Sequence, residues 1–151
     1  MAITYEEVRR RLDVDEPDYI ELQGMGAEAL PHLTQMVVSA DEMLAAKATF
    51  LAGIIPEGDS AAAVSEAVES PHDVVRVAAA STAANLPAEA STEILSALLD
   101  DVDVGVRKVA VKSAITQGSP ELLAKVKQLA EQDAEPWIRA LATESLNDVG
   151  P

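Results

Sequence analysis

Apolar residues recur along this chain three and four positions apart, the spacing that gathers side chains on one face of an α-helix. The segment "DVDVGVRKVAVKSA" shows the pattern most clearly. In it, Val106, Ala110 and Ala114 share one face beside Arg107, and an acidic turn comes directly before them. The segment therefore predicts an amphipathic helix that begins after the aspartates.

The same pattern returns about every thirty residues. Arg76, Arg107 and Arg139 lie 31 and 32 residues apart, with Val or Ile before each arginine and Ala three positions after it. Repetition at such a period is the sequence signature of a solenoid or a similar array. The four copies of the segment are 39–55, 70–86, 101–117 and 133–149.

A second helical pattern precedes each copy, so each unit is predicted to contain helix A, a tight turn and helix B. Ser39 with Glu42, and Ser70 with Asp73, are predicted to form capping boxes that open two of the B helices. The first 26 residues, which include the helical pattern "TYEEVRRRL", are predicted to form an N-terminal cap. The predicted array covers 27–151, in approximate units 27–56, 57–87, 88–118 and 119–149.

Two features resemble HEAT repeats, in particular the short bacterial repeats of the phycobilisome-lyase-like type. An aspartate stands six positions before the arginine, as in Asp101 to Arg107 and Asp133 to Arg139, and the core reads "VRxxA" or "IRxxA". The resemblance covers about residues 27 to 149. It implies an all-α, right-handed solenoid of about four HEAT-like helix pairs with an N-terminal helical cap.

The first two units depart from the family's pattern. Ser39 and Ser70 replace the aspartate, and Ala45 replaces the arginine of the first unit. In the family, the turn aspartate and the helix B arginine form a hydrogen-bonded ladder between stacked units, and the aspartate can also cap helix B. A buried guanidinium needs a paired carboxylate, so a structural ladder is expected here rather than a catalytic site. Its predicted members are Arg76, Asp101, Arg107, Asp133 and Arg139.

Composition narrows the function. The 151 residues are 48% hydrophobic but only 3% aromatic, which favours a core of small and aliphatic side chains between close-packed helices. The chain has no cysteine, so disulfides and thiolate metal sites are excluded. Eleven Lys plus Arg stand against 26 Asp plus Glu, and a net charge of −15 would repel nucleic acid. No signal peptide or membrane-spanning stretch is evident, so a cytoplasmic location and no membrane contact are expected.

No motif of catalysis or cofactor binding stands out. His32 and His72 lack the His-Glu pairing of iron-binding HEAT proteins, and "DDVD" lacks the glycine turn and late glutamate of a calcium loop. The chain contains neither a GxSxG nucleophile elbow nor the glycine-rich loops that cradle phosphates. We therefore expect a protein that is not an enzyme and that holds no metal or cofactor.

Two surfaces are candidates for binding a partner. B helices line the concave face of a HEAT stack, where the helical wheel predicts a small-residue, partly apolar groove that includes an exposed phenylalanine. The A–B turns place many carboxylates along one edge, which would favour a basic partner. The predicted groove residues are Phe50, Val77, Ser81, Lys108, Val111, Lys112 and Glu144.

The C-terminal end of the array is a third candidate. Trp137 stands at the start of the last B helix, where no following unit would cover it, and tryptophan is enriched at interfaces. This position predicts docking or self-association through that end, with symmetric pairing the simplest closed form. The function expected overall is a protein-binding scaffold. Two alternatives are an accessory role like that of bilin lyases, implied by the resemblance, and a module of a larger assembly.

Overall fold

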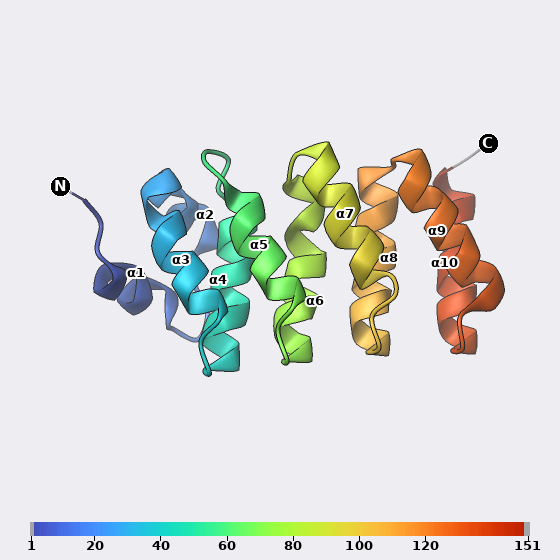
Figure 1. The fold of residues 1–151 in the computed structure, drawn as a ribbon, viewed down its shortest axis with the longest axis horizontal. Helices are drawn as coiled ribbons and strands as arrows, with labels where there is room; N and C mark the ends of the chain where they lie inside the picture. Colours follow the sequence, from blue (N-terminus) through green and yellow to red (C-terminus); the bar gives the residue numbers. More distant parts are fainter. Residues whose placement is uncertain (1, 150–151) are drawn as a thin grey trace.

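The computed structural model describes residues 2–149, and among these residues every regular element is a helix. Figure 1 shows helix pairs standing side by side in chain order, from α3 and α4 to α9 and α10. The N-terminal elements are α1 (Tyr5–Leu12), α2 (Tyr19–Leu22) and the 3-10 helix η1 (Gln23–Ala29). The pairs are α3 (Leu30–Val37) with α4 (Glu42–Ile54), α5 (Ser60–Val68) with α6 (Asp73–Thr82), α7 (Ala88–Leu98) with α8 (Val104–Gln117), and α9 (Pro120–Gln132) with α10 (Pro136–Val149). A short 3-10 turn, η2 (Ala83–Asn85), extends α6.

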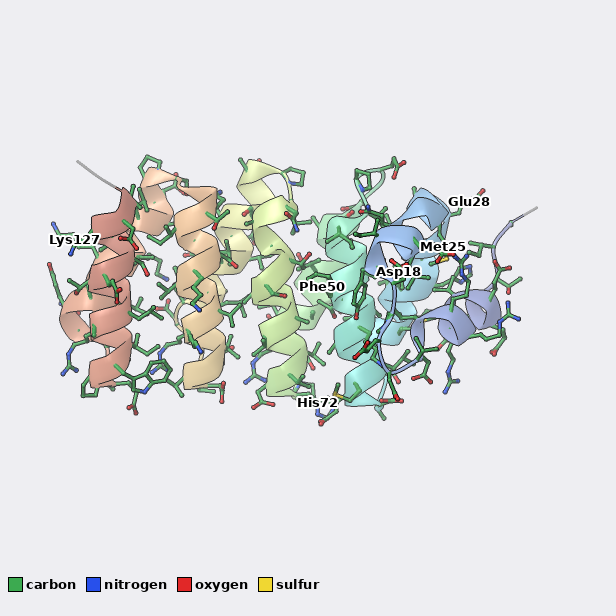
Figure 2. All side chains as sticks on the ribbon, turned by 180° about the vertical axis from the view of Figure 1, so that it is seen from behind. Asp18, Met25, Glu28, Phe50, His72 and Lys127 are labelled. Atoms are coloured by element: carbon green, nitrogen blue, oxygen red, sulfur yellow. The ribbon has the colours of Figure 1, made fainter. Side chains whose placement is uncertain are left out.

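The pairs form two layers, as the predicted solenoid requires. The A helices α3, α5, α7 and α9 face the viewer in Figure 1, and the B helices α4, α6, α8 and α10 face the viewer in Figure 2. Each B helix packs against the B helix of the next unit as well as against the A layer. The predicted all-α solenoid is confirmed.

Small residues let neighbouring B helices approach closely. A Cβ atom added to Gly53 of α4 would lie 2.0 Å from Oγ1 of Thr82 in α6, so only glycine fits at this crossing. The Thr82 hydroxyl donates to the carbonyl oxygen of Phe50 at 3.4 Å. One unit further on, the Ser113 hydroxyl donates to the carbonyl oxygen of Ala80 at 2.6 Å. Side-chain hydroxyls thus join successive B helices where large apolar side chains would not fit.

The B helices begin two residues later than the capping boxes predicted. Asp41 and Asp103 are the N-caps of α4 and α8, and α6 begins after His72 with no hydrogen bond from a side-chain cap. The predicted cap residues instead accept a hydrogen bond from the backbone N–H two positions on, in a tight turn that all four units share. These residues are Ser39, Ser70, Asp101 and Asp133. The prediction was wrong because an extra extended residue separates this turn from the helix.

The N-terminal segment covers the first unit on two sides. Val8 and Leu12 of α1 are fully buried, and α1 packs against α3 and α4. The chain then crosses to the B-helix layer, where the Tyr19 ring meets the Phe50 ring edge-on with centroids 4.8 Å apart. Figure 2 shows Asp18 and Phe50 on this face. Phe50 is therefore partly covered, not exposed as the helical wheel predicted.

Candidate partner-binding surfaces

The ladder arginines each join two units. Nε of Arg107 donates to Asp133 Oδ2 at 2.9 Å and Nη2 donates to Oδ1 at 3.0 Å, while Nη1 donates to the Asp101 carbonyl oxygen at 3.0 Å. Arg76 repeats this geometry with the Asp101 carboxylate, at 2.8 and 3.3 Å, and the Ser70 carbonyl oxygen, at 2.9 Å. Each arginine thus holds the carbonyl of its own turn and the carboxylate of the next turn.

This arrangement fixes the role of the aspartates. The Asp101 carboxylate belongs to Arg76 of the preceding unit, and Arg107 binds the Asp133 carboxylate of the following unit. The Asp101 side chain does not cap helix B, because Asp103 does so. The suggestion that the aspartate six positions before the arginine caps helix B is therefore wrong for this unit.

Both rungs are largely buried, so the loss of one partner would strand the charge of the other. The side chains of Arg107 and Asp133 are only 14% and 5% exposed. Burial of Asp133 acts to raise the pKa of its carboxyl, but hydrogen bonds from Arg107 and from the Glu135 backbone N–H outweigh it and hold that pKa below its ordinary value. A carboxylate that stays ionised and whose oxygens are occupied is suited to holding units together, not to proton transfer.

The ladder is incomplete at both ends. Between the first two units, Ala45 faces a turn that carries Ser70, so neither half of an ion pair is present. At the other end, Nη1 of Arg139 donates to the Asp133 carbonyl oxygen at 2.6 Å. Within residues 2–149, no carboxylate lies within ion-pair distance of Arg139.

Fewer residues of the B-helix face are exposed than the helical wheel predicted. Val111, assigned to the groove, is fully buried, as are Thr49 and Ala80 at the equivalent positions of α4 and α6. α8 lies between α6 and α10, and α6 lies between α4 and α8, so a side chain that points away from layer A can still face a neighbouring B helix. Of the other predicted groove residues, Phe50 and Val77 are partly buried, and four are exposed: Ser81, Lys108, Lys112 and Glu144.

A hollow of about 510 Å³ lies on this face between the N-terminal segment and helices α4 and α6. We call it the cap groove. Its apolar lining includes Tyr19, Met43 and Val77, and Met43 is 54% exposed. The full lining is Asp15, Glu16, Pro17, Tyr19, Met43, Ala46, Lys47, Val74, Val77 and Ala78.

Charges at the cap groove are mostly negative. Asp15 and Glu16 are exposed on its rim. The single cation, Lys47, donates a hydrogen bond from Nζ to the Val14 carbonyl oxygen and so ties the crossing segment to α4. Sequence reasoning found only Val77 here, because the wall of the groove comes from a segment outside the repeat. The sequence did carry one indication of this groove. Two positions before the ladder site, at the start of the B helix, three of the four units have a large apolar residue: Met43, Val74 and Trp137, whereas the third unit has Gly105.

Most carboxylates of the turn edge have a partner, so fewer of them are free to attract a basic protein than the residue count indicated. Asp100 pairs with Lys125, and Glu42 lies 3.1 Å from Nδ1 of His72. Asp41 and Asp103 serve as helix caps, and Asp101 and Asp133 belong to the ladder. Among the described residues of this edge, the carboxylates with neither an ion pair nor a capping bond are Glu69, Asp73, Glu131 and Glu135.

Both histidines have structural partners. Nε2 of His32 lies 2.9 Å from the Ile3 carbonyl oxygen, and its ring meets the Tyr5 ring edge-on. His32 therefore anchors the start of the chain instead of lying free on the surface. In residues 2–149, no group of three or more His, Cys, Asp or Glu side chains is placed to hold a metal ion. No helix in the described part of the chain has the length and apolar character needed to cross a membrane.

Comparison with known proteins agrees with the repeat geometry. A search of curated proteins finds no match to this chain. The family profile for HEAT repeats matches residues 60–147, which is more than half of the chain and includes both complete rungs of the ladder. HEAT repeats commonly mediate contacts between proteins. With stacked helix pairs joined by forward-reaching arginines, the chain belongs to the HEAT-repeat family.

Proposed function

We propose that this protein is a non-enzymatic scaffold that binds a protein partner in the cap groove of its B-helix face. The observation that carries the proposal is the hollow itself, which combines an apolar lining with two exposed carboxylates, Asp15 and Glu16. Exposed apolar surface gathered in a concavity is typical of interaction sites. The half-exposed Met43 is well suited to such a surface, because methionine adapts its shape to the group it contacts.

The chemistry of the groove indicates the partner's chemistry. Tyr19, Met43 and Val77 offer an apolar site for one or two side chains. Asp15 and Glu16 stand beside that site, so a Lys or Arg next to the apolar anchor would gain a favourable electrostatic contact. The turn edge would add long-range attraction for a basic partner and raise its association rate. The expected ligand is a segment in which an apolar residue has basic neighbours.

A displayed library of random peptides tests this proposal, because selection from it works before the partner itself has been identified. Selection on the full chain should enrich peptides with Leu, Met or Phe next to Lys or Arg. Met43→Glu and Val77→Glu should each weaken the selected peptides at least tenfold and leave the helical content unchanged. Val102→Glu is the matched control, because Val102 is 92% exposed and lies on a turn away from the groove. Equal loss of binding in all three variants, or enrichment of acidic peptides, would contradict the proposal.

The accessory role like that of bilin lyases remains a second proposal, which rests on the resemblance alone. Affinity purification from the native host separates the two functions. A stoichiometric protein that is retained by the parent and by Val102→Glu, but lost by Met43→Glu, supports the scaffold. A copurified pigment with visible absorption supports the accessory role.

Self-association remains a proposal as well, and light scattering of the parent and of Trp137→Glu tests it: a parent that stays monomeric at high concentration rules it out.

A further inference from the structure

A second hollow, of about 410 Å³, lies on the turn edge between the first and second units. We call it the turn pocket. It opens between the turn that carries Ser39 and the turn that carries Ser70, and it shares no lining residue with the cap groove. Figure 2 places His72, which lines the turn pocket, at the edge of the stack where the B helices begin.

Guanidinium groups join the units at the two later joints. Arg76 binds the Asp101 carboxylate of the third unit, and Arg107 binds the Asp133 carboxylate of the fourth. Arg107 also lines the corresponding hollow between the turns of the third and fourth units, which measures about 300 Å³. At the first joint Ala45 stands in the place of the arginine, so the preceding unit supplies no cation to the larger hollow there.

Two carboxylates line the turn pocket without a cation to neutralise them. Glu66 and Glu69 are exposed, and among the described residues neither takes part in an ion pair. The residue equivalent to Glu69 one unit later is Asp100, which pairs with Lys125 of the unit that follows it. The residue equivalent to Lys125 one unit earlier is the buried Ile94, which lies beside Glu69 and carries no charge.

This arrangement is unfavourable for the protein on its own. Glu66 and Glu69 stand three positions apart at the C-terminal end of α5, so two like charges are neighbours on the helix surface. That end of a helix also carries a partial negative charge, which favours cations over carboxylates. Local rules of this kind are broken chiefly at functional sites. A bound cation would relieve both penalties.

We propose that the turn pocket binds an arginine side chain of a partner protein. Its guanidinium lies between Glu66 and Glu69, and its apolar stem packs against Val38, which lines the pocket and is 67% exposed. Arginine suits the pocket better than lysine for two reasons. Its planar fork of donors can reach two carboxylates at once, and a guanidinium is more weakly hydrated than an ammonium and so is easier to place against an apolar wall.

The charged groups around the turn pocket are compatible with a bound guanidinium. Arg76 donates to the Ser70 carbonyl oxygen, but the Asp101 carboxylate balances its charge. Nδ1 of His72 lies 3.1 Å from the Glu42 carboxylate, which would offset a proton on the ring. The pocket suits an organic cation better than a metal ion, because in residues 2–149 no three His, Cys, Asp or Glu side chains are placed to hold one.

NMR titration of the full chain labelled with ¹⁵N tests the proposal. The probes are three blocked tripeptides: Ala-Arg-Ala, and its counterparts with lysine or citrulline at the centre. The arginine peptide should give saturable shifts of the amides in 37–40 and 66–72, and the lysine peptide should bind about threefold more weakly or worse. Citrulline keeps the shape of arginine without its charge and should leave these amides unshifted. No saturable shift at these amides, or equal shifts with citrulline, would overturn the proposal. Shifts confined to the cap groove, near residues 15–19, would also overturn it without contradicting the function proposed above.

A pair of double variants tests the two carboxylates. Glu66→Gln with Glu69→Gln should weaken the arginine peptide about tenfold or more, because both charge-assisted contacts lose their charge. The same variant should melt no lower than the parent, since it removes a like-charge pair. Glu89→Gln with Glu121→Gln is the matched control, because it removes two exposed carboxylates at the opposite ends of the A helices and changes the net charge equally. Equal loss of affinity in the two double variants would show general attraction to an acidic protein and would overturn the proposal.

Discussion

Replacing Arg107 with alanine should destabilise the stack by about 3 kcal/mol. The change removes two hydrogen bonds to the Asp133 carboxylate and one each to the carbonyl oxygens of Asp101 and Val102. It leaves Asp133 ionised with its side chain only 5% exposed. Breaking a buried ion pair from one side costs about 3–5 kcal/mol, most of it from the stranded charge. A hollow of about 300 Å³ beside Arg107 and Asp133 gives water access to that charge, which favours the lower end of the range.

Urea unfolding followed by circular dichroism at 222 nm measures the loss, and thermal unfolding should show a midpoint lowered by about 6–12 °C for a chain of this size. Arg139→Ala is the matched control. It removes the same side chain from the equivalent position of the next unit, but it strands no carboxylate in the described residues and removes one hydrogen bond to a carbonyl oxygen. Its expected cost is about 1 kcal/mol.

The effect of Arg107→Ala should also depend on pH. In the parent, the pKa of Asp133 lies below its ordinary value, so the pair's stabilisation is present above the unfolded pKa and is lost as pH falls through the folded pKa. In the variant, burial without the arginine favours the protonated acid. The difference in unfolding free energy between parent and variant should therefore shrink as pH falls below about 4. Equal losses in Arg107→Ala and Arg139→Ala, or a difference that does not change with pH, would refute this reasoning.

Three further changes test other contacts. Gly53→Ala should destabilise the protein by about 1–3 kcal/mol, because the new methyl group meets Thr82 at the crossing of α4 and α6. Thermal unfolding measures the loss, and a melting point equal to the parent's would show that the helices can separate freely. His32→Ala should cost about 1 kcal/mol through its contact with the Ile3 carbonyl oxygen and should expose amides near residue 5 to hydrogen exchange, whereas His72→Ala should leave those amides protected. Asp133→Asn should reduce the loss of stability that is expected of the parent in acid, as measured by urea midpoints from pH 6 to pH 3, and a parent midpoint that does not fall with acid would contradict the assigned role.

The repeated helix pairs were predictable because each unit carries its own periodicity, turn and arginine. The members of the ladder were also predictable, since their residue types recur at fixed positions. The carboxylate that each arginine binds was harder to predict. Asp101 is close to Arg107 in sequence, whereas the carboxylate that Arg107 binds belongs to Asp133, 26 residues away. Spacing along one chain segment does not reveal which unit supplies the second half of a contact.

The surfaces were predicted less well, for a geometric reason. A helical wheel describes one helix, whereas exposure on a solenoid depends on the helices on either side, and so Val111 is buried. The cap groove was missed because one wall comes from Asp15, Glu16, Pro17 and Tyr19, which lie outside the repeat. Tyr19 and Met43 line the same hollow because that segment crosses to the B-helix layer.

The forward reach of each ladder arginine also sets the order of the units. The second unit, with Ser70 in its turn, suits a neighbour that offers Ala45, whereas the third and fourth units, with Asp101 and Asp133, each require an arginine before them. Moving the third unit into second place would set the Asp101 carboxylate behind Ala45, with no cation to neutralise it. Units that share the same helix-pair architecture are therefore not interchangeable, because the two residues that meet at each joint determine which neighbour fits there. Shuffled or duplicated arrays of this chain would be stable only where each turn aspartate still follows a unit that supplies an arginine.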